Sequence, residues 1–257
     1  MKRILVTAAV VILTPIVVLA SVVAYAFIGR QAVADGFEAG DVRIIKEGGG
    51  SIGIVPVGSR EVAIVDAGND KSGEALLAEL ARRKLDAGAV TAIFLTHGHP
   101  DHTGAVALFP NAAVMALAPE VGLIEGTARP SGPLTRFMPL APAGKVTRML
   151  ADGETVTVGY AEVHVYAMPG HTQGSAAYLV GGVLFMGDAA DADSNGRVIA
   201  PPWIFSDSQP QASDSIVTLA DRLRKEKASV RTIAFAHSGV RTEGLAPLVA
   251  FAEGARR

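Results

Sequence analysis

Residues 96–104 read Thr-His-Gly-His-Pro-Asp-His-Thr-Gly and directly follow the apolar run Ala92–Leu95. Three imidazoles and one carboxylate thus fall within six consecutive positions, 97–102. These ligand types suit zinc and, less selectively, iron or manganese. Residues two apart in an extended loop point the same way. We therefore expect His97 and His99 to bind one ion, with Asp101 and His102 facing a second; a solvated polar loop would not need such a density of ligands.

Three more candidates for this centre stand later in the chain. They are His171 in Pro-Gly-His-Thr, Asp188 in Met-Gly-Asp-Ala and His237 in Ala-His-Ser. Each of them follows an apolar run that we expect to be a strand, as do His97 and Asp66. Strands that converge at one edge of a sheet can hold ligands with the precision that a metal needs. Asp66 has an alternative interpretation, because Asp is also favoured in turns and helix caps.

The alternation of apolar runs, turn residues and amphipathic stretches predicts the secondary structure. Strands are expected at 42–45, 52–57, 61–65, 91–95, 112–118, 154–158, 162–168, 176–180, 183–186 and 232–235. Helices are expected at 72–85, 104–109, 213–227 and 245–255.

The H-x-H-x-D-H run with a later His, Asp and His resembles the signature of the metallo-β-lactamase-fold hydrolases. The resemblance covers roughly Val42 to the C-terminus and places five of the six histidines on matching positions. It implies an α/β fold, a four-layer αββα sandwich with two central sheets flanked by helices. The remaining histidine, His164, alternates along a predicted strand and is expected to be an ordinary face residue.

The resemblance also implies the roles of the site residues. The first metal would be held by His97, His99 and His171, and the second by Asp101, His102 and His237. Asp188 would bridge the two ions, with Asp66 beside the ligands. Two divalent ions are implied, zinc first, with iron or manganese as alternatives. Such a pair lowers the pKa of a bridging water toward about 7 and so gives a hydroxide nucleophile, which Asp101 would orient; Asp101 and Asp188 are the predicted catalytic residues.

The substrate is argued from departures from the family pattern. β-Lactamases usually have Cys or Ser at the bridging position, and homoserine-lactone lactonases usually have a Tyr shortly after it, where this chain has residues 189–192, Ala-Ala-Asp-Ala. RNA-processing members carry extra arms or domains, and glyoxalase II-like thioesterases add a helical domain after the last His. The remaining prediction is a compact hydrolase of a small-molecule ester, thioester or lactone. The alternatives are an iron-dependent persulfide dioxygenase, a compact phosphodiesterase, and a membrane-tethered metal-binding protein without chemistry.

Two irregular segments are candidates for substrate contact. Residues 126–145 are rich in Pro, Gly and Ala and carry Phe137 and Met138, whereas residues 191–210 carry Trp203 and Phe205. Long loops without periodicity are often functional, and aromatic residues near a metal site often shape a pocket. A surface connector, or an aromatic packed under a loop, is the alternative for each segment.

Length and composition limit the remaining classes. A chain of 257 residues suits one large domain. Its formal net charge of -2 argues against a nucleic-acid partner. No cysteine is present, which excludes disulfides, thiolate ligands and a cysteine nucleophile. The oligomeric state is left open.

The N-terminus predicts a membrane segment. Residues 4–28 carry no charge, and a helix of that length, about 37 Å, exceeds the roughly 30 Å of hydrocarbon in a bilayer. Lys2 and Arg3 precede this run and Arg30 follows it. We therefore expect an anchor at 1–30, or a cleaved signal sequence, then a linker at 31–41 and a catalytic domain at 42–257. The positive-inside rule places that domain outside the cytoplasm, on the periplasmic or outer side of the membrane.

Overall fold

Two β-sheets form the centre of the structure, a computed structural model that describes residues 2–257, with side chains described from residue 13 onward. The larger sheet has the strand order β1-β2-β3-β4-β5-β6-β7 and the smaller one β14-β11-β10-β9-β8. The strands of the larger sheet are β1 (Phe37–Ala39), β2 (Val42–Glu47), β3 (Gly50–Pro56), β4 (Val62–Val65), β5 (Val90–Phe94), β6 (Ala113–Leu117) and β7 (Arg148–Leu150). Those of the smaller sheet are β8 (Thr155–Val158), β9 (Ala161–Ala167), β10 (Ala176–Val180), β11 (Val183–Phe185) and β14 (Thr232–Ala234). A separate ribbon pairs β12 (Asp191–Ala192) with β13 (Val198–Ile199).

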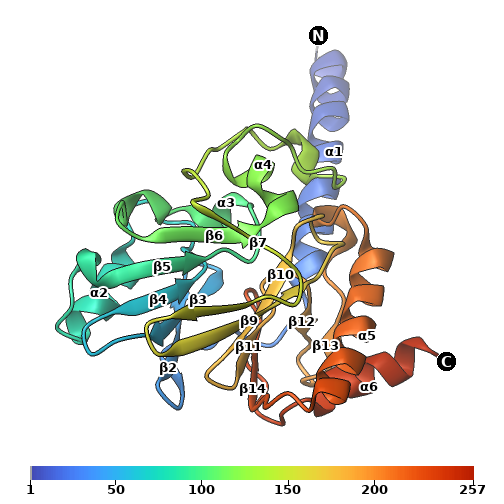
Figure 1. The fold of residues 1–257 in the computed structure, drawn as a ribbon. Helices are drawn as coiled ribbons and strands as arrows, with labels where there is room; N and C mark the ends of the chain where they lie inside the picture. The colour runs from blue at the N-terminus through green and yellow to red at the C-terminus, as the bar shows by residue number, and fades with distance from the viewer. Residues whose placement is uncertain (1) are drawn as a thin grey trace.

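Helices cover the outer faces of both sheets. The α-helices are α1 (Lys2–Phe27), α2 (Glu74–Arg82), α3 (Pro100–Thr103), α4 (Val121–Ile124), α5 (Gln209–Glu226) and α6 (Ala246–Ala255). Figure 1 shows α2 on one flank of the molecule and α5 and α6 on the other, with the sheets between them.

The buried apolar side chains form three clusters that define these layers. One cluster lies between the sheets and includes Phe94 of β5 and Tyr178 of β10, whose rings are 5.3 Å apart. A second packs Leu76 and Leu80 of α2 against the outer face of the larger sheet. A third packs α5 and α6 against the outer face of the smaller sheet. The predicted four-layer αββα sandwich is thereby confirmed.

Parallel strand pairs bring distant parts of the chain to one edge. β4 and β5 are parallel neighbours, and so are β11 and β14. Neighbouring parallel strands end at the same edge of their sheet, so the loops that follow them start side by side. Asp66 and the 96–104 loop follow the first pair, whereas Asp188 and His237 follow the second.

Several boundaries differ from the predictions. The expected linker at 31–41 contains β1, which pairs with β2. The helix expected from residue 213 begins at Gln209, because the Ser208 side chain caps it and Pro210 suits its first turn. The short helix expected at 104–109 is reduced to a 3₁₀ turn over Val106–Leu108. β7 and the β12–β13 ribbon lie in stretches where no strand was predicted.

The predicted membrane anchor over residues 1–30 lies partly outside the described residues, since nothing is described of the side chains of residues 1–12. In the part of the chain that was described, no helix combines the length and apolar character needed to cross a membrane.

Candidate metal centre

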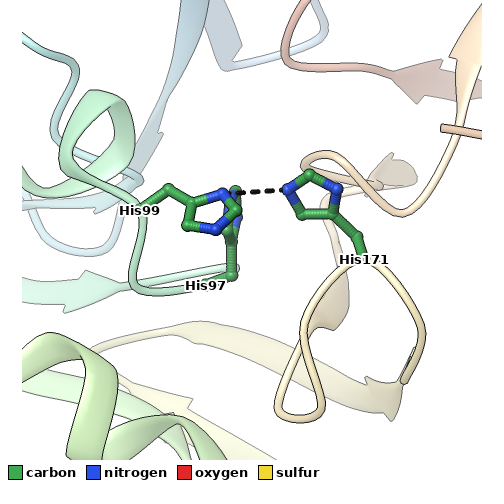
Figure 2. Close-up of side chains that lie close together, drawn as sticks. All are labelled: His97, His99 and His171. Atoms are coloured by element: carbon green, nitrogen blue, oxygen red, sulfur yellow. Dashed lines mark hydrogen bonds between the residues drawn. The ribbon is translucent and has the colours of Figure 1, made fainter. Parts of the chain in front are cut away.

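Three buried histidines converge on one point. His97 and His99 come from the 96–104 loop, and His171 comes from the loop after β9, as Figure 2 shows. The Nδ1 atom of His99 lies 3.0 Å from Nε2 of His97 and 3.0 Å from Nε2 of His171. The three rings therefore present their nitrogen atoms to a common centre, which is the arrangement of a three-histidine metal site.

Burial keeps these three imidazoles uncharged. It lowers the pKa of His97 well below its ordinary value, that of His99 to about 4 and that of His171 to about 3. The neutral imidazole is the form that binds a metal ion.

A second set of donors lies beside the first. Nε2 of His237 is 3.3 Å from an Oδ atom of Asp101, and Nε2 of His102 is 3.9 Å from the same oxygen. These three residues form a further group of donor atoms within 4.8 Å of one another. Two of the three are histidine nitrogens, so the second set also suits zinc.

Asp188 stands between the two sets. Its Oδ2 atom lies 3.5 Å from Nε2 of His171 and 3.3 Å from Nε2 of His237, while Oδ1 lies 3.4 Å from Nε2 of His102. One carboxylate thus faces ligands of both predicted ions.

Four histidine rings point Nε2 toward the centre, those of His97, His102, His171 and His237. The outer nitrogen of each ring, Nδ1, has a hydrogen-bond partner. Nδ1 of His97 lies 3.2 Å from Thr96 Oγ1, and Nδ1 of His102 lies 2.8 Å from Asp66 Oδ2. Nδ1 of His171 lies 3.2 Å from Ser206 Oγ, and Nδ1 of His237 lies 3.0 Å from the carbonyl oxygen of Gly49. Each Nδ1–H donates to its partner, because the carboxylate and the carbonyl only accept and the two hydroxyls donate elsewhere. In the neutral form of each ring this tautomer leaves the Nε2 lone pair directed at the centre.

These tautomers test whether the donor set fits a metal. Lone pairs of His97 and His171 both face Nδ1 of His99 at 3.0 Å, and one proton cannot satisfy all three nitrogens. Among the described residues, buried Nε2 of His102 and buried Oδ1 of Asp188 have no hydrogen-bond partner. Buried polar atoms are normally satisfied, so the seven side chains fit a pair of cations.

Charges at the second set support the same conclusion. Burial acts to lower the pKa of His102, but the carboxylates of Asp66, Asp188 and Asp101 outweigh it and hold that pKa well above its ordinary value. The carboxylate of Asp188 raises the pKa of His237 to about 12. These imidazoles hold protons because carboxylates surround them, and a divalent cation would take the place of those protons.

Asp66 is buried beside the ligands rather than acting as a helix cap. It accepts hydrogen bonds of 2.7 Å from both the backbone N–H and the hydroxyl of Thr96, in addition to the bond from His102. Its φ of 61° is in the left-handed region, which Asp and Asn tolerate better than most residues. The left-handed backbone conformation at Asp66 therefore accompanies a carboxylate that orients the ring of His102.

Sequence reasoning missed Glu120, which connects two of the ligand loops. Its carboxylate accepts a 2.7 Å hydrogen bond from the backbone N–H of Gly98 and a 2.9 Å bond from the hydroxyl of Thr172. Burial raises the pKa of Glu120 to about 7. No sequence pattern marks this residue, since it follows a proline in a short 3₁₀ turn.

A cavity of about 220 Å³ opens onto the donor atoms. Besides five of the ligands, its wall consists of apolar residues and a few polar ones: Phe27, Arg30, Asn69, Pro100, Thr135, Met138, Pro202 and Phe205. Met138 and Phe205 were predicted to contact substrate and do line the cavity. Phe137 and Trp203 do not line it, and their side chains are 76% and 56% exposed. Their loops reach the site through the neighbouring residues instead, and a loop without periodicity does not reveal which of its residues faces inward.

A larger cavity, of about 780 Å³, lies away from the candidate ligands around Tyr160, His164 and Arg231. His164 is on β9, and its Nδ1 atom lies 2.9 Å from the hydroxyl of Thr155. This cavity contains none of the seven candidate ligands, so the smaller one is the candidate reaction site.

Residues 46–237 match the metallo-beta-lactamase superfamily, a range that ends at the last candidate ligand. The chain belongs to the metallo-beta-lactamase superfamily. It is 31% identical over 139 residues to a hydroxyacylglutathione hydrolase of Vibrio cholerae, a match that covers 54% of this chain and 46% of that protein. It is also 30% identical over 153 residues to metallo-beta-lactamase domain-containing protein 1 of Homo sapiens, covering 57% of this chain and 50% of the human protein. The chain thus spans about half the length of these relatives.

Solved structures of the superfamily share the fold. A B3 metallo-beta-lactamase with an active-site glutamic acid superposes with a TM-score of 0.65 at 20% identity, covering 91% of each chain. The metallo-beta-lactamase SMB-1 bound to 2-mercaptoethanesulfonate superposes with a TM-score of 0.64 at 22% identity, covering 89% of this chain and 94% of that one. Because the sequence identities are only 20% and 22%, the structural similarity shows the fold alone.

Proposed function

We propose that this superfamily member is a dinuclear hydrolase that cleaves a thioester or a related ester or lactone of a small acyl compound. The observation that carries the proposal is the position of Asp188, whose carboxylate lies within 3.5 Å of ligand nitrogens from both donor sets. One carboxylate shared by two adjacent sets suits a pair of ions that act together.

Each donor set would hold one divalent ion. His97, His99 and His171 would hold the first and Asp101, His102 and His237 the second, with Asp188 shared. Two such ions, when bound, polarise the attacked carbonyl and lower the pKa of a water molecule so that it is a nucleophile near neutral pH. Zinc is the ion that this mixture of imidazole and carboxylate suits first.

Asp101 differs from the other ligands in its exposure. Its side chain is 44% exposed and lines the cavity, whereas that of Asp188 is 14% exposed. Burial acts to raise the pKa of Asp101, but the neighbouring imidazoles of His102 and His237 outweigh it and hold that pKa far below the ordinary value. Asp101 is therefore a permanent acceptor at the cavity, able to orient the attacking water by accepting one of its protons in a hydrogen bond.

Thioester is the favoured bond because of the relatives. Hydroxyacylglutathione hydrolases match this chain at 31% identity in Vibrio cholerae and at 36% identity over 110 residues in Halorhodospira halophila. Their name describes cleavage of an acyl–sulfur bond. These matches cover 54% and 42% of this chain, so the same reaction type is the first to test here.

The test is a hydrolysis panel on the full chain reconstituted separately with zinc, manganese and iron. The panel contains a 2-hydroxyacyl thioester of glutathione, a simple acyl thioester, an aryl ester, a lactone, a phosphodiester and, with oxygen uptake recorded, a persulfide. We expect thioester turnover that depends on two metal ions per chain. One iron per chain with oxygen uptake on a persulfide, or turnover of the phosphodiester alone, would contradict the proposal.

The extracytoplasmic location stays a prediction that depends on the sequence alone. It derives from Lys2 and Arg3 before the uncharged run and from the scarcity of positive charge after it. Protease protection of the full chain in intact cells and in lysed cells tests it, and complete protection from external protease after the outer layers are opened would contradict it.

A further inference from the structure

The cavity wall contains residues from the end of the N-terminal helix α1 and from the segment that follows it. Phe27 and Arg30 line it together with the ligands His99, His171, Asp188 and His237. The ring of Phe27 lies 5.8 Å from that of Phe205 and 6.2 Å from that of His237. This segment therefore forms part of the candidate reaction site, although sequence reasoning had assigned it to the anchor.

Backbone hydrogen bonds hold the segment in place. The N–H of Gln31 donates to the carbonyl of Ala192 at 3.0 Å, and the N–H of Ser194 donates to the carbonyl of Gly29 at 2.6 Å. Residues 192–194 come just after Asp188 in the chain. The position of Arg30 is thus coupled to the strand end that carries the shared ligand.

Arg30 is buried and only partly paired. Its side chain is 6% exposed, and its Nη1 atom lies 2.7 Å from Asp191 Oδ2, while its guanidinium carbon lies 4.7 Å from the centre of the Phe27 ring. Asp191 compensates its charge, so Arg30 is held rigidly at the cavity. Its buried Nε–H has no hydrogen-bond partner among the described residues.

Thr135 supplies a second unpaired group in the same wall. It is 1% exposed and lines the cavity, and in the described part of the chain no atom forms a hydrogen bond with its hydroxyl. Leaving a buried polar group unpaired is energetically unfavourable. Arg30 and Thr135 line the same cavity, so their unpaired groups are candidates to bind acceptor atoms of a ligand there.

The size of the cavity and its lining restrict that ligand. About 220 Å³ is below the roughly 300–1,000 Å³ of a pocket for a drug-sized ligand. Phe27, Met138, Pro202 and Phe205 make much of the wall apolar. A short acyl chain fits this lining, and a carboxylate is the acceptor that an arginine binds most strongly.

We propose that Arg30, assisted by Thr135, is a specificity-determining residue that binds a carboxylate on the acyl part of a short substrate whose reacting carbonyl faces the metal ligands. This inference deepens the proposed function and rests on it for the identity of the reacting bond. The recognition itself depends only on the cavity wall, so binding measures it separately from turnover.

The test is a calorimetric titration of the full, zinc-loaded chain with succinate and with butyrate. Both have four carbons and one carboxylate for the metals, and only succinate has a second carboxylate for Arg30. A hydrogen bond to a charged group is worth about 1.5–3 kcal/mol, which corresponds to about ten- to hundredfold in affinity. We expect succinate to bind tighter than butyrate by that factor.

Substitutions in the cavity wall test whether Arg30 and Thr135 cause the preference for succinate over butyrate. R30K keeps the charge opposite Asp191 but removes the Nε–H and the planar fork, so it should bring succinate to within about twofold of butyrate, with unchanged zinc content. T135V removes a hydroxyl that has no hydrogen-bond partner among the described residues, so it should fold normally and weaken succinate binding severalfold; it is the second test if R30K is unstable. R148K, in an exposed ion pair with Glu154 outside the cavity, is the matched control and should change nothing.

The outcomes separate the two proposals. Equal affinity of the wild type for both acids, or an unchanged preference in both R30K and T135V, overturns the role of Arg30 and Thr135. Succinyl and butyryl thioesters of one thiol should show the same preference in kcat/KM. If the binding preference is present but no thioester is cleaved, the recognition stands and the proposed hydrolytic function is wrong.

Discussion

The carboxylate of Glu120 accepts a 2.7 Å hydrogen bond from the backbone N–H of Gly98, the residue between ligands His97 and His99. Its other oxygen accepts a 2.9 Å bond from the hydroxyl of Thr172, the residue after His171. One buried side chain therefore holds together the two loops that supply the three-histidine set.

We expect E120A to weaken metal binding at the first site by about 10–100-fold, because partners that orient ligands typically contribute that much. Competition with a chromophoric chelator measures the affinity. E125A is the matched control, since Glu125 also accepts a backbone hydrogen bond, from the N–H of Val146 at 3.1 Å, and Val146 lies outside the loops that carry the candidate ligands. Equal affinity of E120A and E125A would show that Glu120 has no positioning role.

Asp66 provides a second positioning test, on the other donor set. D66N keeps a residue that tolerates the φ of 61°, but it replaces the charged partner of His102 with a neutral amide. The second ion should then bind about 10–100-fold more weakly, while the first binds as in the wild type. Metal content per chain after dialysis against graded chelator checks this, and an equal loss of both ions would mean that the variant disturbs the whole fold.

The convergence of the candidate ligands was predictable because sequence and topology agree there. His97, Asp188 and His237 each follow an apolar run, and parallel strand pairs in both sheets bring the ends of such runs to one edge. The chemistry of the ligands restricts residue type as well as position. Residue type and position after an apolar run are therefore enough to select the candidate ligands from the sequence.

The residues that sequence reasoning missed are fixed by tertiary contacts alone. Glu120 has an ordinary place in a short turn, and its role exists only because Gly98 and Thr172 come near it. Arg30 was used only as a topology signal, since nothing in the sequence indicates its ion pair with Asp191. Among the loop aromatics, exposed Trp203 and inward Phe205 have the same sequence context.

Removing the shared carboxylate should separate the two ions. We expect D188A to lower kcat by about 10²-fold or more and to loosen at least one ion, because Asp188 faces nitrogens of His102, His171 and His237. Metal analysis and rates on the best thioester measure both effects. H164A is the control, since His164 is the one histidine outside the site, and it should keep full metal content. Wild-type rates in D188A, or lost metal in H164A, would contradict the assignment of ligands.

Glu79 should make the stability of the larger-sheet layer depend on pH. Its carboxylate lies 2.8 Å from Arg82 Nε, 2.7 Å from Arg83 Nε and 3.1 Å from Arg43 Nε, and so joins α2 to β2. Burial of Glu79 acts to raise its pKa, but hydrogen bonds from Arg82 and Arg83 and the charge of Arg43 outweigh it and lower the pKa from 4.5 to about 2.

A carboxyl whose pKa is lower in the folded than in the unfolded chain stabilises the fold above the unfolded value. The contribution should therefore be full above pH 4.5 and should disappear as the pH falls toward about 2. Urea unfolding of wild type and E79Q should differ by roughly 2–3 kcal/mol at pH 7, and the difference should shrink below pH 4.5. E74Q, at the exposed first residue of the same helix, should differ from the wild type by no more than about 0.3–1 kcal/mol, the contribution of a carboxylate at a helix N-terminus. A difference between wild type and E79Q that stays constant from pH 7 to pH 3 would mean that Glu79 acts through packing and not through its charge.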